Sequence, residues 1–92
     1  MSRLIRMSRY YFDIREGARI VPDEEGMEFE SLDAAEREAA EAAAEIGRDR
    51  LPKGDAQEVT IELKNEHRQR VLTVTVAIEI NPVDPEPLPP RW

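Results

Sequence analysis

Carboxylates are the side chains of this sequence most able to do chemistry, and ten of them fall in one block from Asp23 to Glu45. Clustered carboxylates suit the binding of Ca²⁺ or Mg²⁺ and acid–base catalysis. The densest stretch is Asp-Glu-Glu-Gly-Met-Glu at residues 23–28, but it lacks the alternating oxygen ligands and the final Glu of an EF-hand loop. We interpret it as a hairpin turn and keep a carboxylate-based, metal-dependent enzyme as an alternative.

Composition excludes most other catalytic chemistry. The chain contains no cysteine and a single histidine, His67, which removes thiolate nucleophiles, disulfides, cysteine-ligated metals and two-histidine metal sites. The four glycines match no phosphate-binding loop. We predict a protein that is not an enzyme, and we assign no catalytic residue, no metal ligand and no cofactor.

Aromatic and arginine residues near the N-terminus offer a second chemistry. Tyr10, Tyr11 and Phe12 lie beside Arg9 and Arg15, and some folds bind bases with aromatic side chains and arginines on a strand. The acidic block that follows repels phosphate. Nucleic-acid binding by Arg9, Tyr11 and Arg15 is therefore an alternative that we do not favour.

The charge of the chain points to a protein partner. Twenty acids against thirteen bases give a net charge of −7, and within the acidic block only Arg37 opposes the carboxylates. Such a surface attracts a basic protein, although the same pattern also serves to keep a small protein soluble. We predict an interaction module that binds a basic partner. The candidate contact residues are Asp23, Glu24, Glu25, Glu38, Glu41 and Glu45.

Residue patterns predict two β-hairpins separated by one helix. Alternation of apolar and polar residues predicts strands at 10–16, 19–21, 59–64 and 72–80, of which the last is the longest, and it allows a short further segment at 27–29. Ser31 is expected to cap an alanine-rich helix that Pro52 ends. The predicted fold is α+β, a two-layer ββαββ arrangement with the helix packed on an antiparallel sheet made of the two hairpins.

The folded domain is expected to span residues 9–81. A flexible extension is expected at residues 1–8, and a disordered tail at residues 82–92, which hold five of the seven prolines. No apolar run is long enough to span a membrane and no secretory signal is present, so we expect a cytoplasmic protein without membrane contact. A core of this size gains stability by pairing, and we predict a homodimer through the last strand or its sheet face.

The run Arg-Tyr-Tyr-Phe-Asp-Ile-Arg-Glu-Gly at residues 9–17 resembles the opening of a family of short bacterial proteins of unknown function. Asp-Glu-Glu-Gly at residues 23–26 matches the family's Asp-x-Glu-Gly turn, and Leu-Asp-Ala-Ala at residues 32–35 matches its Leu-x-x-Ala helix start. The resemblance covers about residues 9–80 and makes Met7 a second candidate start site. It transfers no functional site, because the family has no agreed activity.

A looser similarity is to the partner-binding domain of HicB-type antitoxins. Those domains have an aromatic first strand, an acidic hairpin that contains glycine and a Ser-Leu-x-x-Ala helix, which Ser31 to Ala35 matches. The DNA-binding helices of such antitoxins have no counterpart here, since the proline-rich segment stands in their place. The similarity implies a small basic protein as the partner.

Overall fold

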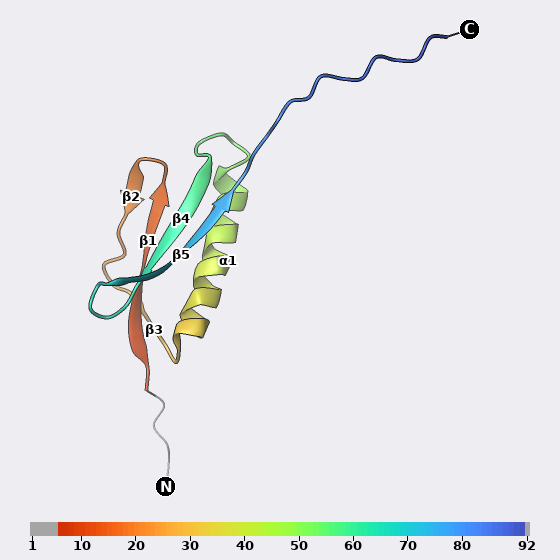
Figure 1. The fold of residues 1–92 in the computed structure, drawn as a ribbon. Coiled ribbons are helices and arrows are strands. Elements are labelled where there is room, and N and C mark those ends of the chain that lie inside the picture. Colours follow the sequence, from red (N-terminus) through yellow and green to blue (C-terminus); the bar gives the residue numbers. More distant parts are fainter. Residues whose placement is uncertain (1–5, 92) are drawn as a thin grey trace.

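The sheet is built around strand β1 (Ser8–Glu16), which pairs with three other strands. The computed structural model describes residues 6–91. In this structure β1 pairs in antiparallel fashion with β2 (Arg19–Val21), β3 (Met27–Phe29) and β4 (Glu58–Lys64). Strand β5 (Arg70–Ala77) pairs with β4, so that the five-stranded sheet runs β2-β1-β4-β5 with β3 also on β1 (Figure 1).

Three strands precede the helix, which corrects the predicted ββαββ order while the α+β class is confirmed. The chain that returns along β1 is divided into two short pieces, β2 and β3, by the turn at residues 22–26. Proline and a left-handed glycine, Gly26 with φ +71°, cannot continue a regular strand at this point. The return strand predicted at residues 19–21 is present, and the further segment allowed at residues 27–29 is the third strand before the helix.

Helix α1 (Leu32–Arg50) begins and ends at signals that lie in the local sequence. The hydroxyl of Ser31 accepts a hydrogen bond of 3.1 Å from the Ala34 amide, as the capping prediction requires. At the other end, Leu51 is the C-cap and Pro52 follows it. Arg48 and Arg50 lie in the last turn, where positive charge complements the helix dipole.

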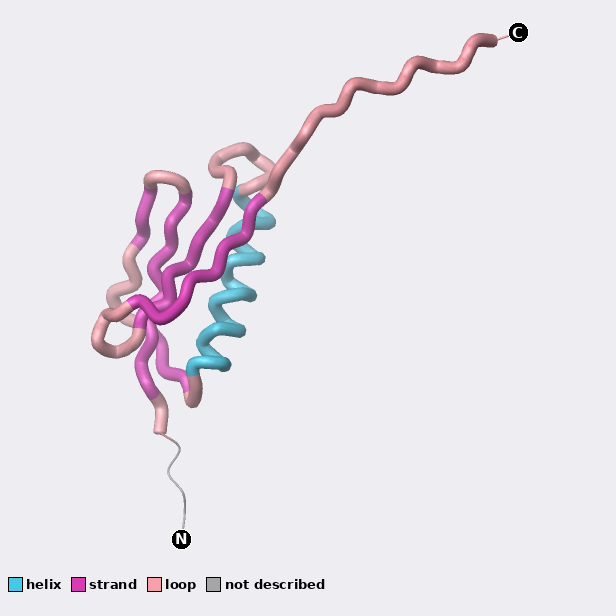
Figure 2. Tube along the Cα trace, viewed as in Figure 1, coloured by secondary structure: helices cyan, strands magenta, loops and turns pink. Residues whose placement is uncertain are grey.

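Helix α1 lies along one face of the sheet (Figure 2), and the hydrophobic core is formed between the two. Val59, Ile61 and Leu63 of β4 are fully buried, because β4 is flanked by β1 and β5 and covered by the helix. Small side chains on the helix allow this close approach. The buried helix residues are Ala35, Ala39, Ala43 and Gly47.

Strand β5 ends at Ala77, and the nine-residue β1 is the longest strand, so the prediction of a longest last strand through residue 80 is wrong. Beyond Ala77, the described residues keep one ladder bond, in which the Ile78 amide donates to the Gln57 carbonyl at 3.3 Å. Strand β4 starts at Glu58 and offers residues 79 and 80 no partner. Strand β1 extends further because it has a partner along its whole length.

The chain beyond the sheet contains no helix or strand from residue 78 to residue 91, and Figure 1 shows it leaving the domain as an extended segment. At the N-terminal side, Ser8 already pairs with Phe29, so the sheet begins one residue before the expected boundary. Residues 6 and 7 of the expected extension lie in no helix or strand, and its residues 1–5 lie outside the described residues. Within residues 6–91, no helix has the length and apolar character needed to cross a membrane.

The backbone at Gly26 generates the first prediction. A Cβ atom there would lie 2.8 Å from the Tyr10 carbonyl oxygen, and φ is +71°, whereas a Cβ on Gly17 (φ +60°) would meet nothing within 4 Å. We expect Gly17→Ala to cost ~1–2 kcal/mol from backbone strain alone. Gly26→Ala should cost at least ~1 kcal/mol more, because β1 and the turn must separate. Urea unfolding of both variants measures this, and equal losses would contradict it.

Candidate functional site

The six candidate contact residues fall into two separate groups. Glu38, Glu41 and Glu45 are exposed on α1, which packs on β4 and β5 and, more weakly, on β3. The other three, at residues 23–25, follow β2, which lies at the opposite edge of the sheet from β5. The acidic block is continuous in the sequence, but it supplies two surfaces and not one.

Asp23 uses its carboxylate inside the fold. One oxygen, Oδ2, accepts a hydrogen bond of 3.0 Å from the Phe12 amide in β1. The other, Oδ1, accepts bonds of 3.2 and 3.0 Å from the amides of Glu25 and Gly26. The carboxylate thus supplies the acceptor for β1 where the return strand is interrupted, which makes Asp23 a structural residue. Glu24 and Glu25 keep exposed side chains.

Asp13 is the buried partner of this turn, with 5% of its surface exposed. Its Oδ1 accepts a hydrogen bond of 2.9 Å from the Asp23 amide, and its Oδ2 lies 2.6 Å from the Lys64 ammonium. Burial acts to raise the pKa of Asp13, but the Asp23 amide, Lys64 and the charge of Arg68 outweigh it and hold the pKa below its usual value. The carboxylate therefore stays charged at neutral pH.

Arg68 joins the β4–β5 hairpin to the same turn. Its guanidinium lies 3.6 Å from the centre of the Tyr11 ring, a cation–π contact. It also donates to the carbonyl oxygens of Asp23 and Glu24, at 3.1 and 3.5 Å. Arg68 adopts φ +63°, the only positive φ of a residue other than glycine in the described chain. Nothing in the local sequence signals this role.

The residues considered for nucleic-acid binding are all engaged within the chain. Arg9 donates to the Glu25 carbonyl at 2.6 Å and lies 3.6 Å from the Glu28 carboxylate. Arg15 lies 3.7 Å from Glu62, and Tyr11 is covered by the guanidinium described above. Glu62 also accepts from Arg70 at 2.8 Å. The basic side chains of the open sheet face are therefore largely balanced by internal acceptors.

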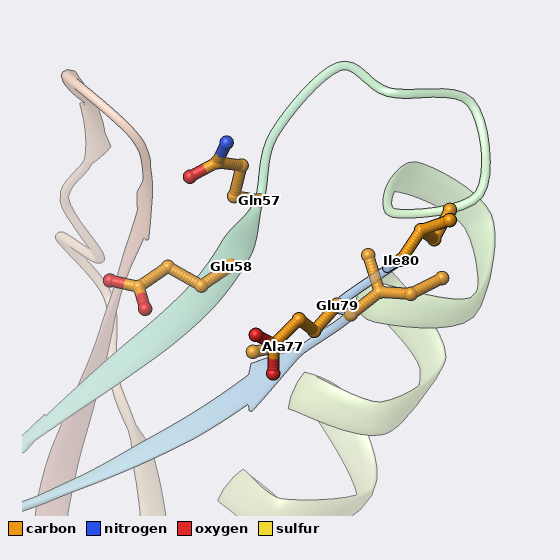
Figure 3. Close-up of a pocket in the computed structure, with 6 residues that line it drawn as sticks. Gln57, Glu58, Ala77, Glu79 and Ile80 are labelled. Carbon is orange, nitrogen blue, oxygen red and sulfur yellow. The ribbon is translucent and has the colours of Figure 1, made fainter. Parts of the chain in front are cut away.

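The described residues contain no group of three or more His, Cys, Asp or Glu side chains placed to hold a metal ion. His67 is exposed at the hairpin tip, 3.6 Å from Glu66. A shallow pocket lies where β4 starts and β5 ends (Figure 3). Glu58 and Glu79 are the charged residues that line it, and no serine, histidine or lysine lines it beside them.

The Asp13 carboxylate gives a prediction about pH. Its pKa in the folded chain is below the ordinary 3.8, so its stabilising effect is complete above that pH and is lost as the pH falls through the folded value. Asp13→Asn should lower the free energy of unfolding at pH 7 by about 1–3 kcal/mol. Its stability should also fall less between pH 5 and pH 2 than that of the unmodified chain.

The matched control is Asp55→Asn, which removes an exposed carboxylate in the loop before β4. Urea unfolding at several pH values compares the three proteins. The structural role of Asp13 is refuted if Asp13→Asn and Asp55→Asn have the same stability across this range.

Comparison with known proteins identifies a family but no better-known relative. Residues 9–77 match the domain of unknown function DUF6894, from the second residue of β1 to the end of β5. No curated protein and no solved structure matches the chain, so the similarity to HicB-type antitoxins stays a prediction. The family match begins at Arg9, as the resemblance in the sequence predicts, and covers every helix and strand of the fold except the first residue of β1. The chain belongs to the DUF6894 family of domains of unknown function.

Proposed function

We propose that this domain is a non-enzymatic interaction module that binds a basic protein through the exposed acidic surface of α1. The observation that carries the proposal is that three carboxylates on that helix are exposed and unpaired among the described residues. Glu38, Glu41 and Glu45 are exposed, and no basic side chain of the described residues lies within 4.0 Å of them. They are free to pair with an external cation.

The position of these carboxylates supports one continuous contact surface. Residues 38, 41 and 45 are three and four positions apart, which places them along one side of a helix. Arg37 and Arg48 are also exposed on α1, but the helix as a whole keeps a net negative charge because six of its acids are exposed. Charge of this kind steers and orients a basic partner.

The turn at residues 22–26 is a weaker candidate for the same contact. The carboxylate of Asp23 already accepts three backbone hydrogen bonds, so it has little capacity left for a partner. Glu24 and Glu25 follow β2, at the opposite edge of the sheet from β5. We therefore restrict the proposed contact to α1.

The alternatives have less support from the geometry. An enzyme that uses residues 23–28 would need carboxylates free to bind a metal or a substrate, and Asp23 is occupied. Nucleic-acid binding would need Arg9, Tyr11 and Arg15 to leave their internal partners. A basic protein is also the partner class that the similarity to HicB-type antitoxins implies.

Charge reversal on α1 tests the proposal. The triple change Glu38→Lys, Glu41→Lys and Glu45→Lys should weaken binding of a basic protein captured from the native cell at least ~10-fold, because each exposed pair contributes ~0.2–1 kcal/mol and reversal adds repulsion. Calorimetry or fluorescence anisotropy measures the Kd, and affinity for the unmodified domain should fall as salt rises.

The control changes the same amount of charge elsewhere. Asp55→Lys, Asp84→Lys and Glu86→Lys alter exposed acids outside the helix and give the same net charge as the test variant. This control should bind nearly as well as the unmodified domain. Equal affinity of the two triple variants would refute the α1 surface, and capture of only acidic partners would refute the charge argument.

A further inference from the structure

Strand β5 is an unprotected sheet edge. It lies at one end of the order β2-β1-β4-β5, and among the described residues no strand pairs with its outer side. Its eight residues contain no proline, and its charged residue, Arg70, is at its first position. The irregularity in its pairing with β4 is also confined to that end. Natural edge strands are usually shortened, bulged or charged in the middle to prevent pairing.

The opposite edge of the sheet, formed by β2 and β3, is protected against pairing with another strand, whereas β5 is not. Strands β2 and β3 are three residues each. Between them, the carboxylate of Asp23 takes up the Phe12 amide that a continuous strand would have bound. The contrast indicates that the long, regular edge of β5 is kept open for a partner strand.

The core beneath β5 is also incomplete. Leu72, Val74 and Val76 face the helix but are only half-buried, whereas the core residues of the neighbouring β4 are fully buried. Another apolar side chain of this strand, Val71, is 40% exposed. A strand added beside β5 would cover part of this apolar surface and so gain free energy from burial.

We propose that the occupant of this edge is β5 of a second copy of the chain, paired in antiparallel fashion about a two-fold axis near Val74. Because opposite residues of antiparallel strands share a face, Thr73 of each copy then lies opposite Thr75 of the other. Leu72 likewise lies opposite Val76. Threonine pairs and apolar pairs of this kind stabilise antiparallel ladders.

Charge at the two ends of the strand favours a second copy paired antiparallel to the first. Arg70 lies at the hairpin end of β5. Glu58 and Glu79 lie at the other end, where Figure 3 shows them around the shallow pocket, and neither has a basic partner within 4.0 Å among the described residues. Arg70 already pairs with Glu62 of its own chain at 2.8 Å, but its side chain is 60% exposed. Antiparallel pairing would bring Glu79 of the other copy toward the same guanidinium. Because the dimer is symmetric, this pairing of opposite charges occurs twice.

The helices leave room for this arrangement. Helix α1 packs to the same extent on β4 and β5, so with strands ~4.8 Å apart the two α1 axes would lie ~10 Å from one another. Gly47 sits against Val76 of β5, and Ala40 and Ala44 continue the same helical stripe as exposed small residues. Small side chains thus lie on the flank that faces the second helix.

Light scattering coupled to size-exclusion chromatography tests this dimer with the full chain. The unmodified protein should reach a mass about twice the 10.6 kDa of one chain as concentration rises. Arg70→Glu and Glu79→Arg should each raise the dimer dissociation constant about 10-fold, since each variant places like charges together. The double variant should bind more tightly than either single variant, although residue 70 then still repels Glu62 of its own chain. A folding defect alone would not give this recovery.

Arg19→Glu is the matched control, because Arg19 is exposed on β2 at the far edge of the sheet. It should leave the dissociation constant unchanged. Hydrogen exchange should show that β5 amides become protected as the dimer forms. The proposal is overturned by a monomer at every concentration, by a dimer whose new protection lies outside β5, or by a double variant no better than the single ones.

Discussion

Two aspartate side chains, each accepting a backbone hydrogen bond from the other's segment, hold the first half of the fold. The carboxylate of Asp13 binds the amide of Asp23, and the carboxylate of Asp23 binds the amide of Phe12, the residue before Asp13. The exchange gives β1 its partner where the returning chain departs from the sheet. Lys64 then compensates the buried charge from β4, and Arg68 fastens the last hairpin to the carbonyls of the same turn. Strands from both halves of the chain are thus fixed relative to one buried carboxylate.

The acidic residues of this chain perform two different physical roles. Asp13 and Glu62 are buried. Asp13 pairs with Lys64, and Glu62 pairs with Arg15 and Arg70, so the charges on this part of the open sheet face balance one another. Glu38, Glu41 and Glu45 of α1 are exposed to water, and no basic side chain of the described residues lies within 4.0 Å of them. A net charge of −7 counts both kinds equally. The electrostatic field that a partner would meet comes from the exposed carboxylates.

The features that could be predicted from the sequence are those that depend on residues close together in the chain. The Ser31 cap, the end of α1 before Pro52 and the alternation in β1 and β4 each depend on residues close in the chain. The role of Asp23 depends on Phe12, and that of Arg68 on a carbonyl 45 residues away, so no periodicity reveals them. Likewise, the apolar alternation continues to Ile80, but the strand stops where β4 no longer provides a partner. Candidate contact residues could be chosen by charge, while their division between two surfaces required the sheet order.

The interrupted return along β1 has a consequence for how copies of this chain could assemble. A sheet with two open edges propagates, because every added copy presents a fresh edge and growth has no natural end. Here the side that carries β2 and β3 is short and closed by a side chain, so growth could proceed only from β5. A molecule with a single adhesive edge forms a closed pair and not a fibre. The turn at Asp23 therefore limits the size of any assembly that the exposed strand begins.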